Sequence, residues 1–180
     1  MDKKVGRAKN IVLIGFMGTG KTSVGRLLAA RLGRRFIDID RKIEQENKMT
    51  IAEMFASHGE EFFRRKEREM VARVSRFHGA VIATGGGTVL VPENMERLRA
   101  SGFIVSLTAS VQTILERTGR RNTRPLLERP DREEFVTNLL AEREKLYRQA
   151  DLCINTDHSA PIRTVEKIVE FVRREGQYHG

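Results

Sequence analysis

The chain has 180 residues, the usual length of one compact domain, and we expect a single domain over residues 1–180. With 39% apolar and 32% charged residues, no Trp and a single cysteine, its composition is that of a globular protein and excludes an internal disulfide. The net charge of +9 would suit binding to nucleic acid, an acidic membrane surface or an anionic small molecule. Basic residues are interleaved with acidic ones except between Arg117 and Arg132, which makes a nucleic-acid groove the weaker interpretation.

Short apolar runs alternate with longer amphipathic segments, a pattern typical of a parallel sheet covered by helices on both faces. The first strand is predicted at residues 10–14, followed by a helix from Lys21 that ends at Gly33, a favoured left-handed C-cap. The second strand is predicted at residues 35–38. Thr50 and Glu53 match a capping box, which predicts a helix that closes at Gly59, with another helix over residues 60–77.

The remaining strands are predicted at residues 80–84, 103–107 and 152–155. Helices are expected to begin near Pro92 and Ser110, and a last helix to run from about Pro161 to Arg174. Together these elements predict an α/β fold with three layers, α/β/α, a five-stranded parallel sheet and a core over about residues 10–172.

The segment GRRNTRPLLERPDRE interrupts this pattern with two prolines, many arginines and little apolar periodicity. A loop of this length inside a compact domain is usually functional, so we expect an Arg-rich lid over about residues 118–132, with an ordinary solvated loop as the alternative.

The segment GFMGTGKT matches the phosphate-binding loop G-x-x-x-x-G-K-[ST] and lies between a predicted strand and a predicted helix. Its glycines allow backbone N–H groups to turn inward around phosphate oxygens, and the helix N-terminus adds partial positive charge. Lys21 can then reach the β- and γ-phosphates of a nucleotide, and Thr22 can bind Mg²⁺. The residues expected to hold the nucleotide here are Gly15, Gly18, Thr19, Gly20, Lys21, Thr22 and Ser23.

This loop alone does not distinguish a kinase from a GTPase, an ATPase or a passive binder. The third strand runs into TGGG without an acid, so the carboxylate on the metal side is expected from FIDID. In extended geometry Asp38 and Asp40 would project to the same side at the carboxyl edge of the sheet. The alternative is that Asp40 caps a helix and Asp38 lies on the surface. The glycines of TGGG would either admit a substrate close to the backbone or form a plain turn.

Taken in order, GFMGTGKT, FIDID, EFFRRKE, TGGG, RNTRPLL and EREKLY resemble the shikimate kinase family, small members of the nucleoside-monophosphate-kinase-like P-loop fold. The resemblance covers about residues 10–172. It implies an enzyme that transfers the γ-phosphate of ATP, with Mg²⁺, to the 3-hydroxyl of shikimate in aromatic amino-acid biosynthesis. A related kinase acting on gluconate or another hydroxy acid is one alternative. A nucleotide-dependent regulator or nucleic-acid binder is another.

The resemblance also implies roles on the acceptor side. Arg64 and Arg143 would grip the acceptor carboxylate with their guanidinium forks, aided by Gly86 and Gly87. Asp40 would bind the ring hydroxyls and help to take the proton of the attacking one. The acceptor pocket would further be lined by Phe63, Glu67 and Gly85.

On the nucleotide side, the resemblance implies that Asp38 lies near Mg²⁺ and that Arg117 lies against the adenine. Arg124, in the expected lid, would neutralise charge as the phosphoryl group moves. Lys21, Asp40 and Arg124 are thus the expected catalytic residues.

The basic first residues are followed by an apolar run too short for a signal sequence or a membrane span. We therefore expect a cytoplasmic protein with no membrane or nucleic-acid partner. A monomer is expected because no apolar heptad repeat or uncovered apolar stripe is evident.

Overall fold

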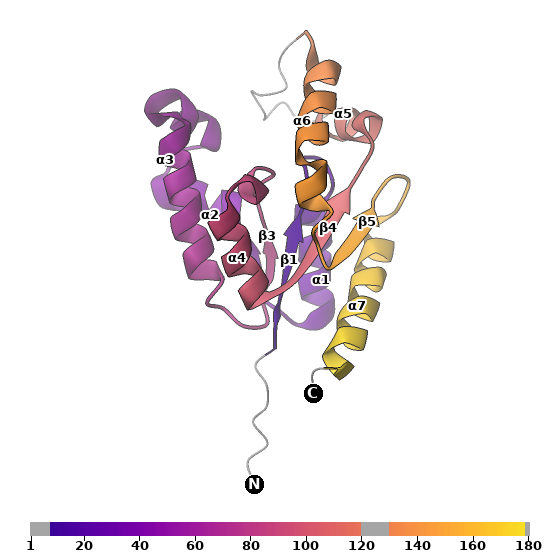
Figure 1. Ribbon diagram of the computed structural model, residues 1–180. Helices are drawn as coiled ribbons and strands as arrows, with labels where there is room; N and C mark the ends of the chain where they lie inside the picture. The colour runs from indigo at the N-terminus through magenta and orange to yellow at the C-terminus, as the bar shows by residue number, and fades with distance from the viewer. Residues whose placement is uncertain (1–7, 120–129, 179–180) are drawn as a thin grey trace.

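The structure, a computed structural model, describes residues 8–119 and 130–178. The fold is built on one five-stranded parallel sheet (Figure 1). The strands occur in the order β2-β3-β1-β4-β5, and each neighbouring pair is parallel. They are β1 (Asn10–Ile14), β2 (Phe36–Asp38), β3 (Val81–Ala83), β4 (Gly102–Thr108) and β5 (Leu152–Asn155). The predicted α/β fold with a five-stranded parallel sheet is confirmed, and the predicted strand ends differ by one residue at most.

The helices that cover this sheet include two that the sequence pattern did not predict, α2 and α6. In chain order the helices are α1 (Lys21–Leu32), α2 (Ile39–Asn47), α3 (Ile51–Val74), the 3-10 turn η1 (Thr88–Leu90), α4 (Pro92–Ser101), α5 (Val111–Gly119), α6 (Arg132–Tyr147) and α7 (Pro161–Tyr178). Helix α6 was not predicted because it carries little apolar periodicity. Its buried residues are Val136, in the second turn, and Tyr147, the last residue.

The three layers follow from β1, which is apolar on both faces. Ile11 and Leu13 pack in one cluster with residues of α1 and α7, whereas Val12 and Ile14 pack in a second cluster with residues of α2, α3 and α4. Side chains of a strand alternate between the two faces, so a continuous buried run such as β1 requires helices on both sides. Figure 1 shows the strands between these helices.

The structure confirms two predictions about where helices end or begin. Gly33 is the left-handed C-cap of α1, with φ 62°, and Thr50 and Glu53 form the reciprocal capping box of α3. Gly59, where the first helix was predicted to close, interrupts α3 with φ 79° and ψ 171°. The second predicted helix follows directly, but it ends at Val74, earlier than predicted.

The predicted extended arrangement of Asp38 and Asp40 is wrong. Strand β2 ends at Asp38, whose carboxylate accepts a hydrogen bond from the backbone N–H of Arg41 and caps α2. Asp40 therefore lies in the first helical turn, and the alternative prediction that Asp40 is the cap is also wrong. The Asp38 carboxylate satisfies an N–H group that would otherwise be free, which stabilises the start of α2 at this position.

Asn10 joins β1 to the connection between α3 and β3. Its side-chain amide donates to the carbonyl of Phe77 at 2.7 Å and accepts from the N–H of Ala80 at 2.9 Å, and the residue is fully buried. Replacing Asn10 with alanine would leave both backbone groups without these partners. We expect Asn10→Ala to lower the free energy of unfolding by about 3 kcal/mol, measured by denaturant titration.

Ser106 on β4 provides the matched control for this substitution. It is equally buried, but its hydroxyl has no hydrogen-bond partner in the part of the chain that the structure describes. Ser106→Ala should change the unfolding free energy by less than about 1 kcal/mol. Equal losses for the two variants would contradict the role given to Asn10.

Among the residues that the structure describes, none of the helices combines the length and the apolar character needed to cross a bilayer.

Candidate active site

The phosphate-binding loop follows β1 and opens α1 at the carboxyl edge of the sheet. Gly18 and Gly20 have φ values of 78° and 95°, which other residues rarely adopt. The buried hydroxyl of Thr19 donates to the carbonyl of Phe16 at 2.8 Å and fixes the turn. Gly20 is the N-cap of α1, and no described side chain caps that helix. The N–H groups of a first helical turn have no partner within the helix, so this end of α1 offers an anion-binding site.

Lys21 lies across this loop. Its ammonium donates hydrogen bonds to the carbonyls of Gly15 at 2.7 Å and Phe16 at 2.8 Å. These bonds hold a positive charge directly at the loop, where it would meet the phosphates of a bound nucleotide.

Thr22 and Asp38 form a pair of oxygen ligands between α1 and the end of β2. The Thr22 hydroxyl donates to Asp38 Oδ2 at 2.9 Å, while Asp38 Oδ1 accepts from the Arg41 N–H. Within residues 8–119 and 130–178 no group of three or more His, Cys, Asp or Glu side chains could hold a metal ion. The Thr22 hydroxyl and the Asp38 carboxylate offer the oxygen ligands that Mg²⁺ prefers, and this ion binds few protein oxygens and takes further ligands from water and phosphates.

The glycines after β3 are packed against charged side chains of two helices. A Cβ at Gly85 would lie 2.7 Å from Asp40 Oδ1, and a Cβ at Gly87 would lie 2.7 Å from an Arg64 guanidinium nitrogen. Such distances are shorter than real contacts, so a side chain at either position would displace the Asp40 carboxylate of α2 or the Arg64 guanidinium of α3.

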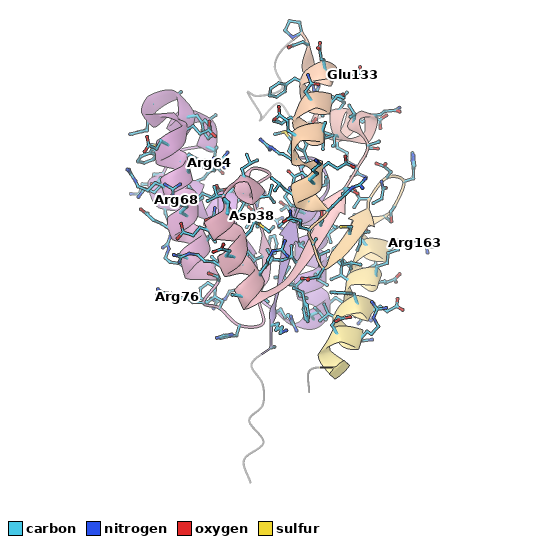
Figure 2. The ribbon with its side chains drawn as sticks, viewed as in Figure 1. Asp38, Arg64, Arg68, Arg76, Glu133 and Arg163 are labelled. Carbon is cyan, nitrogen blue, oxygen red and sulfur yellow. The ribbon has the colours of Figure 1, made fainter. Side chains whose placement is uncertain are left out.

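Arg64 is held in place by two glutamates of its own helix. It pairs with Glu67 at 2.9 Å and with Glu60 at 3.2 Å. Burial by itself would lower the pKa of Arg64, but attraction to these carboxylates outweighs burial and raises the pKa, so the guanidinium stays charged. Figure 2 shows Arg64 on α3, above Arg68 and Arg76 in this view.

Glu67 and Phe63 lie behind Arg64. Glu67 is fully buried, and its second carboxylate oxygen accepts a 2.6 Å hydrogen bond from the hydroxyl of Thr88. Phe63 is also buried, and the Arg64 guanidinium carbon lies 5.3 Å from the centre of its ring. Both therefore support the guanidinium. Thr88 was missed by the sequence analysis, since only the folded chain brings it to Glu67.

Arg143 and Tyr147 of α6 contact Gly86, the middle one of the three glycines after β3. The Tyr147 hydroxyl donates to the carbonyl of Gly86 at 2.7 Å, and an Arg143 guanidinium nitrogen donates to it at 3.4 Å. The Arg143 guanidinium carbon lies 5.8 Å from the centre of the Phe16 ring in the phosphate-binding loop. Arg64 and Arg143, far apart in sequence, thus border one short segment. The sequence motif EREKLY contained Tyr147, but its role was not predicted.

Arg117 of α5 joins the phosphate-binding loop to the segment after β5. It donates to the carbonyl of Gly18 at 3.2 Å and to the carbonyl of Thr156 at 2.7 Å. The Thr156 hydroxyl in turn donates to the carbonyl of Thr19 at 3.1 Å. Thr156 was not predicted as a site residue, and it places the segment after β5 beside the nucleotide loop.

Most of the expected lid, including Arg124, lies outside the described residues, so the lid stays a prediction. The described residues on either side of 120–129 are joined by Arg132, which donates to the hydroxyl of Thr118 at 2.7 Å and to the carbonyl of Leu115 at 2.9 Å.

A family model described as shikimate kinase matches residues 17–173. The curated shikimate kinase of Thermodesulfovibrio yellowstonii is 48% identical over 166 residues, covering 92% of this chain and 96% of the relative. The chain belongs to the shikimate kinase family. The curated shikimate kinase of Geobacter sulfurreducens is 44% identical, with 92% and 91% of the two chains covered. The shikimate kinase of Acinetobacter baumannii, solved in complex with shikimate, has a TM-score of 0.89 and 38% identity over 93% of this chain and 94% of that one.

Family membership confirms the predicted class, a kinase with the P-loop fold that uses a nucleotide as phosphate donor. A gluconokinase from Sinorhizobium meliloti also resembles the structure, with a TM-score of 0.60 and 17% identity. That similarity reflects the fold alone, so it lends no support to the gluconate alternative.

Proposed function

We propose that this shikimate kinase family member transfers the γ-phosphate of Mg-ATP to the 3-hydroxyl of shikimate, giving shikimate 3-phosphate and ADP. One observation carries the proposal. The phosphate-binding loop with Lys21 lies beside a glycine segment, residues 85–87, that is bordered by the guanidinium groups of Arg64 and Arg143. This arrangement supports a nucleotide site that adjoins a site for a carboxylate.

On the donor side, the backbone N–H groups of the loop and Lys21 bind the β- and γ-phosphates. Thr22 and Asp38 would hold Mg²⁺, which would compensate charge on the phosphates. Arg117 lies against the adenine, a role supported by its bonds to Gly18 and Thr156. Arg124 compensates charge on the transferred group, a role that rests on the family resemblance.

On the acceptor side, Arg64 and Arg143 bind the carboxylate of shikimate and orient the ring, because a guanidinium fork matches a carboxylate. Asp40, next to Gly85, binds the ring hydroxyls. The attacking hydroxyl oxygen forms a bond to the γ-phosphorus while the bond from that phosphorus to the β-phosphate oxygen breaks. Asp40 takes the hydroxyl proton, and Lys21 stabilises the charge left on ADP.

The acceptor assignment is tested by an ADP-release assay with shikimate, quinate, gluconate and nucleoside monophosphates. We expect kcat/KM for shikimate to exceed that for every other acceptor by about a hundredfold or more, because a site built to bind a carboxylate and ring hydroxyls together leaves buried polar groups unpaired when an acceptor lacks one of them or holds them in another geometry. Turnover should stop when Mg²⁺ is removed with a chelator and return when it is restored. Turnover confined to gluconate or to a nucleoside monophosphate would overturn the proposal.

The monomeric state, the cytoplasmic location and the absence of a nucleic-acid or membrane partner stay predictions from the sequence.

A further inference from the structure

The Gly86 carbonyl accepts hydrogen bonds from two side chains of α6. The bond from the Tyr147 hydroxyl is short, at 2.7 Å, whereas the bond from Arg143 is long, at 3.4 Å. Tyr147 is 4% exposed, so its ring is fixed by packing and its hydroxyl has a defined position. The stronger of the two bonds therefore comes from a residue with no role in the function proposed above.

The orientation of the Gly86 carbonyl also decides where the next N–H group points. In a trans peptide the carbonyl of one residue and the N–H of the next lie on opposite sides of the bond, and the described residues contain no cis peptide. A carbonyl held toward α6 therefore turns the Gly87 N–H away from α6. Gly87 is the residue that packs against Arg64.

This peptide needs an external anchor because it lies between glycines. Residues 85–87 have no Cβ to restrict rotation of the peptide units. Gly86 also packs near the phosphate-binding loop, since a Cβ there would lie 3.5 Å from the Met17 nitrogen. Rotation of the Gly86 peptide would thus disturb both halves of the proposed site.

We propose that Tyr147 is a positioning residue, whose hydroxyl anchors the Gly86 carbonyl and so keeps the Gly87 N–H directed at the acceptor carboxylate. Arg143 exchanges its bond to the Gly86 carbonyl for a bond to that carboxylate when the acceptor binds. The proposal rests on the acceptor site described under the proposed function. The long Arg143 bond is the one that is readily exchanged, because a charged carboxylate is a stronger acceptor than a backbone carbonyl.

Tyr147 stays a donor over the working range of pH. Burial raises the pKa of its hydroxyl, and the weaker opposing influence of Arg143 does not cancel that increase. The hydroxyl proton that Tyr147 donates in its hydrogen bond to the Gly86 carbonyl is therefore retained at neutral and mildly alkaline pH.

Tyr147→Phe removes the hydroxyl and keeps the ring. We expect the KM for shikimate to rise about 3- to 10-fold, the magnitude of one lost neutral hydrogen bond, with kcat and the KM for ATP changed less than about twofold. Calorimetric titration of shikimate into the nucleotide-free variant should show Kd weakened by a similar factor.

Thr164→Val is the matched control, because it also removes a buried hydroxyl. Thr164 lies on α7, and its hydroxyl has no hydrogen-bond partner within the described residues. This variant should leave both KM values unchanged.

A purely structural role for Tyr147 would lower the melting temperature while leaving the shikimate KM and Kd at their wild-type values, and that result would overturn the inference. An equal rise in the two KM values would also overturn it. Failure of the proposed function looks different, because wild-type protein would then show no turnover with shikimate.

Discussion

Lys21→Ala is expected to lower kcat about a thousandfold or more, equivalent to about 4 kcal/mol of transition-state stabilisation. The ammonium of Lys21 is held on the phosphate-binding loop by the carbonyls of Gly15 and Phe16, so its charge is already positioned before the reaction. Charge that develops on the transferred and leaving phosphates would lose this partner in the variant. Steady-state ADP release at saturating shikimate measures the effect.

The Lys21→Ala variant should keep the fold. Lys21 is the first residue of α1 and is only partly buried, and alanine is a strong helix former. Its circular dichroism spectrum should match the wild type, and its melting temperature should change by only a few degrees.

Lys167→Ala, which removes an exposed lysine from α7, serves as the control for lost charge and should keep wild-type turnover. Near-normal turnover in Lys21→Ala would contradict the assignment of the nucleotide site.

Arg64→Lys is expected to lower kcat/KM for shikimate about 10- to 100-fold, the magnitude of one lost charge-assisted hydrogen bond. Lysine keeps the positive charge beside Glu67 but lacks the planar fork that can bind Glu67, Glu60 and a carboxylate together. The loss should appear mainly in the KM for shikimate, with the KM for ATP close to wild type.

Lysine is a better test at this position than alanine. Arg64→Ala would leave the fully buried carboxylate of Glu67 without its cation, at a cost to stability of about 3–5 kcal/mol, which would mix unfolding with lost binding. Arg65→Lys is the matched control, because Arg65 is the exposed neighbour in the same helix. If both lysine variants bound shikimate as tightly as the wild type, Arg64 would not contact the acceptor.

The elements that could be predicted from the sequence are those decided by nearby residues. Periodic apolar residues and a C-cap glycine specify α1, and the capping box of Thr50 and Glu53 specifies the start of α3. The phosphate-binding loop could be predicted equally well, since its glycines, Lys21 and Thr22 occur in one short segment. These features need no information about distant parts of the chain.

Other elements depend on which of two local options the fold stabilises. The segment FIDID could continue as a strand or turn into a helix. In the folded chain it turns into α2, and the Asp38 carboxylate accepts a hydrogen bond from the Arg41 N–H at the start of that helix. Helix α6 has too weak an apolar pattern to be recognised in isolation, and its buried Val136 and Tyr147 acquire partners only from the folded core.

The sequence by itself determined the strands and most helices, the phosphate-binding loop, and the residue types available to a carboxylate site. Only the tertiary structure decided that Glu67 and Thr88 hold Arg64, and that Tyr147 holds the Gly86 carbonyl. The physical reason is that caps and periodicity act over a few residues, whereas these hydrogen bonds depend on how helices pack against the sheet edge. Gly86 and Tyr147 are 61 residues apart, and no local pattern specifies that they meet.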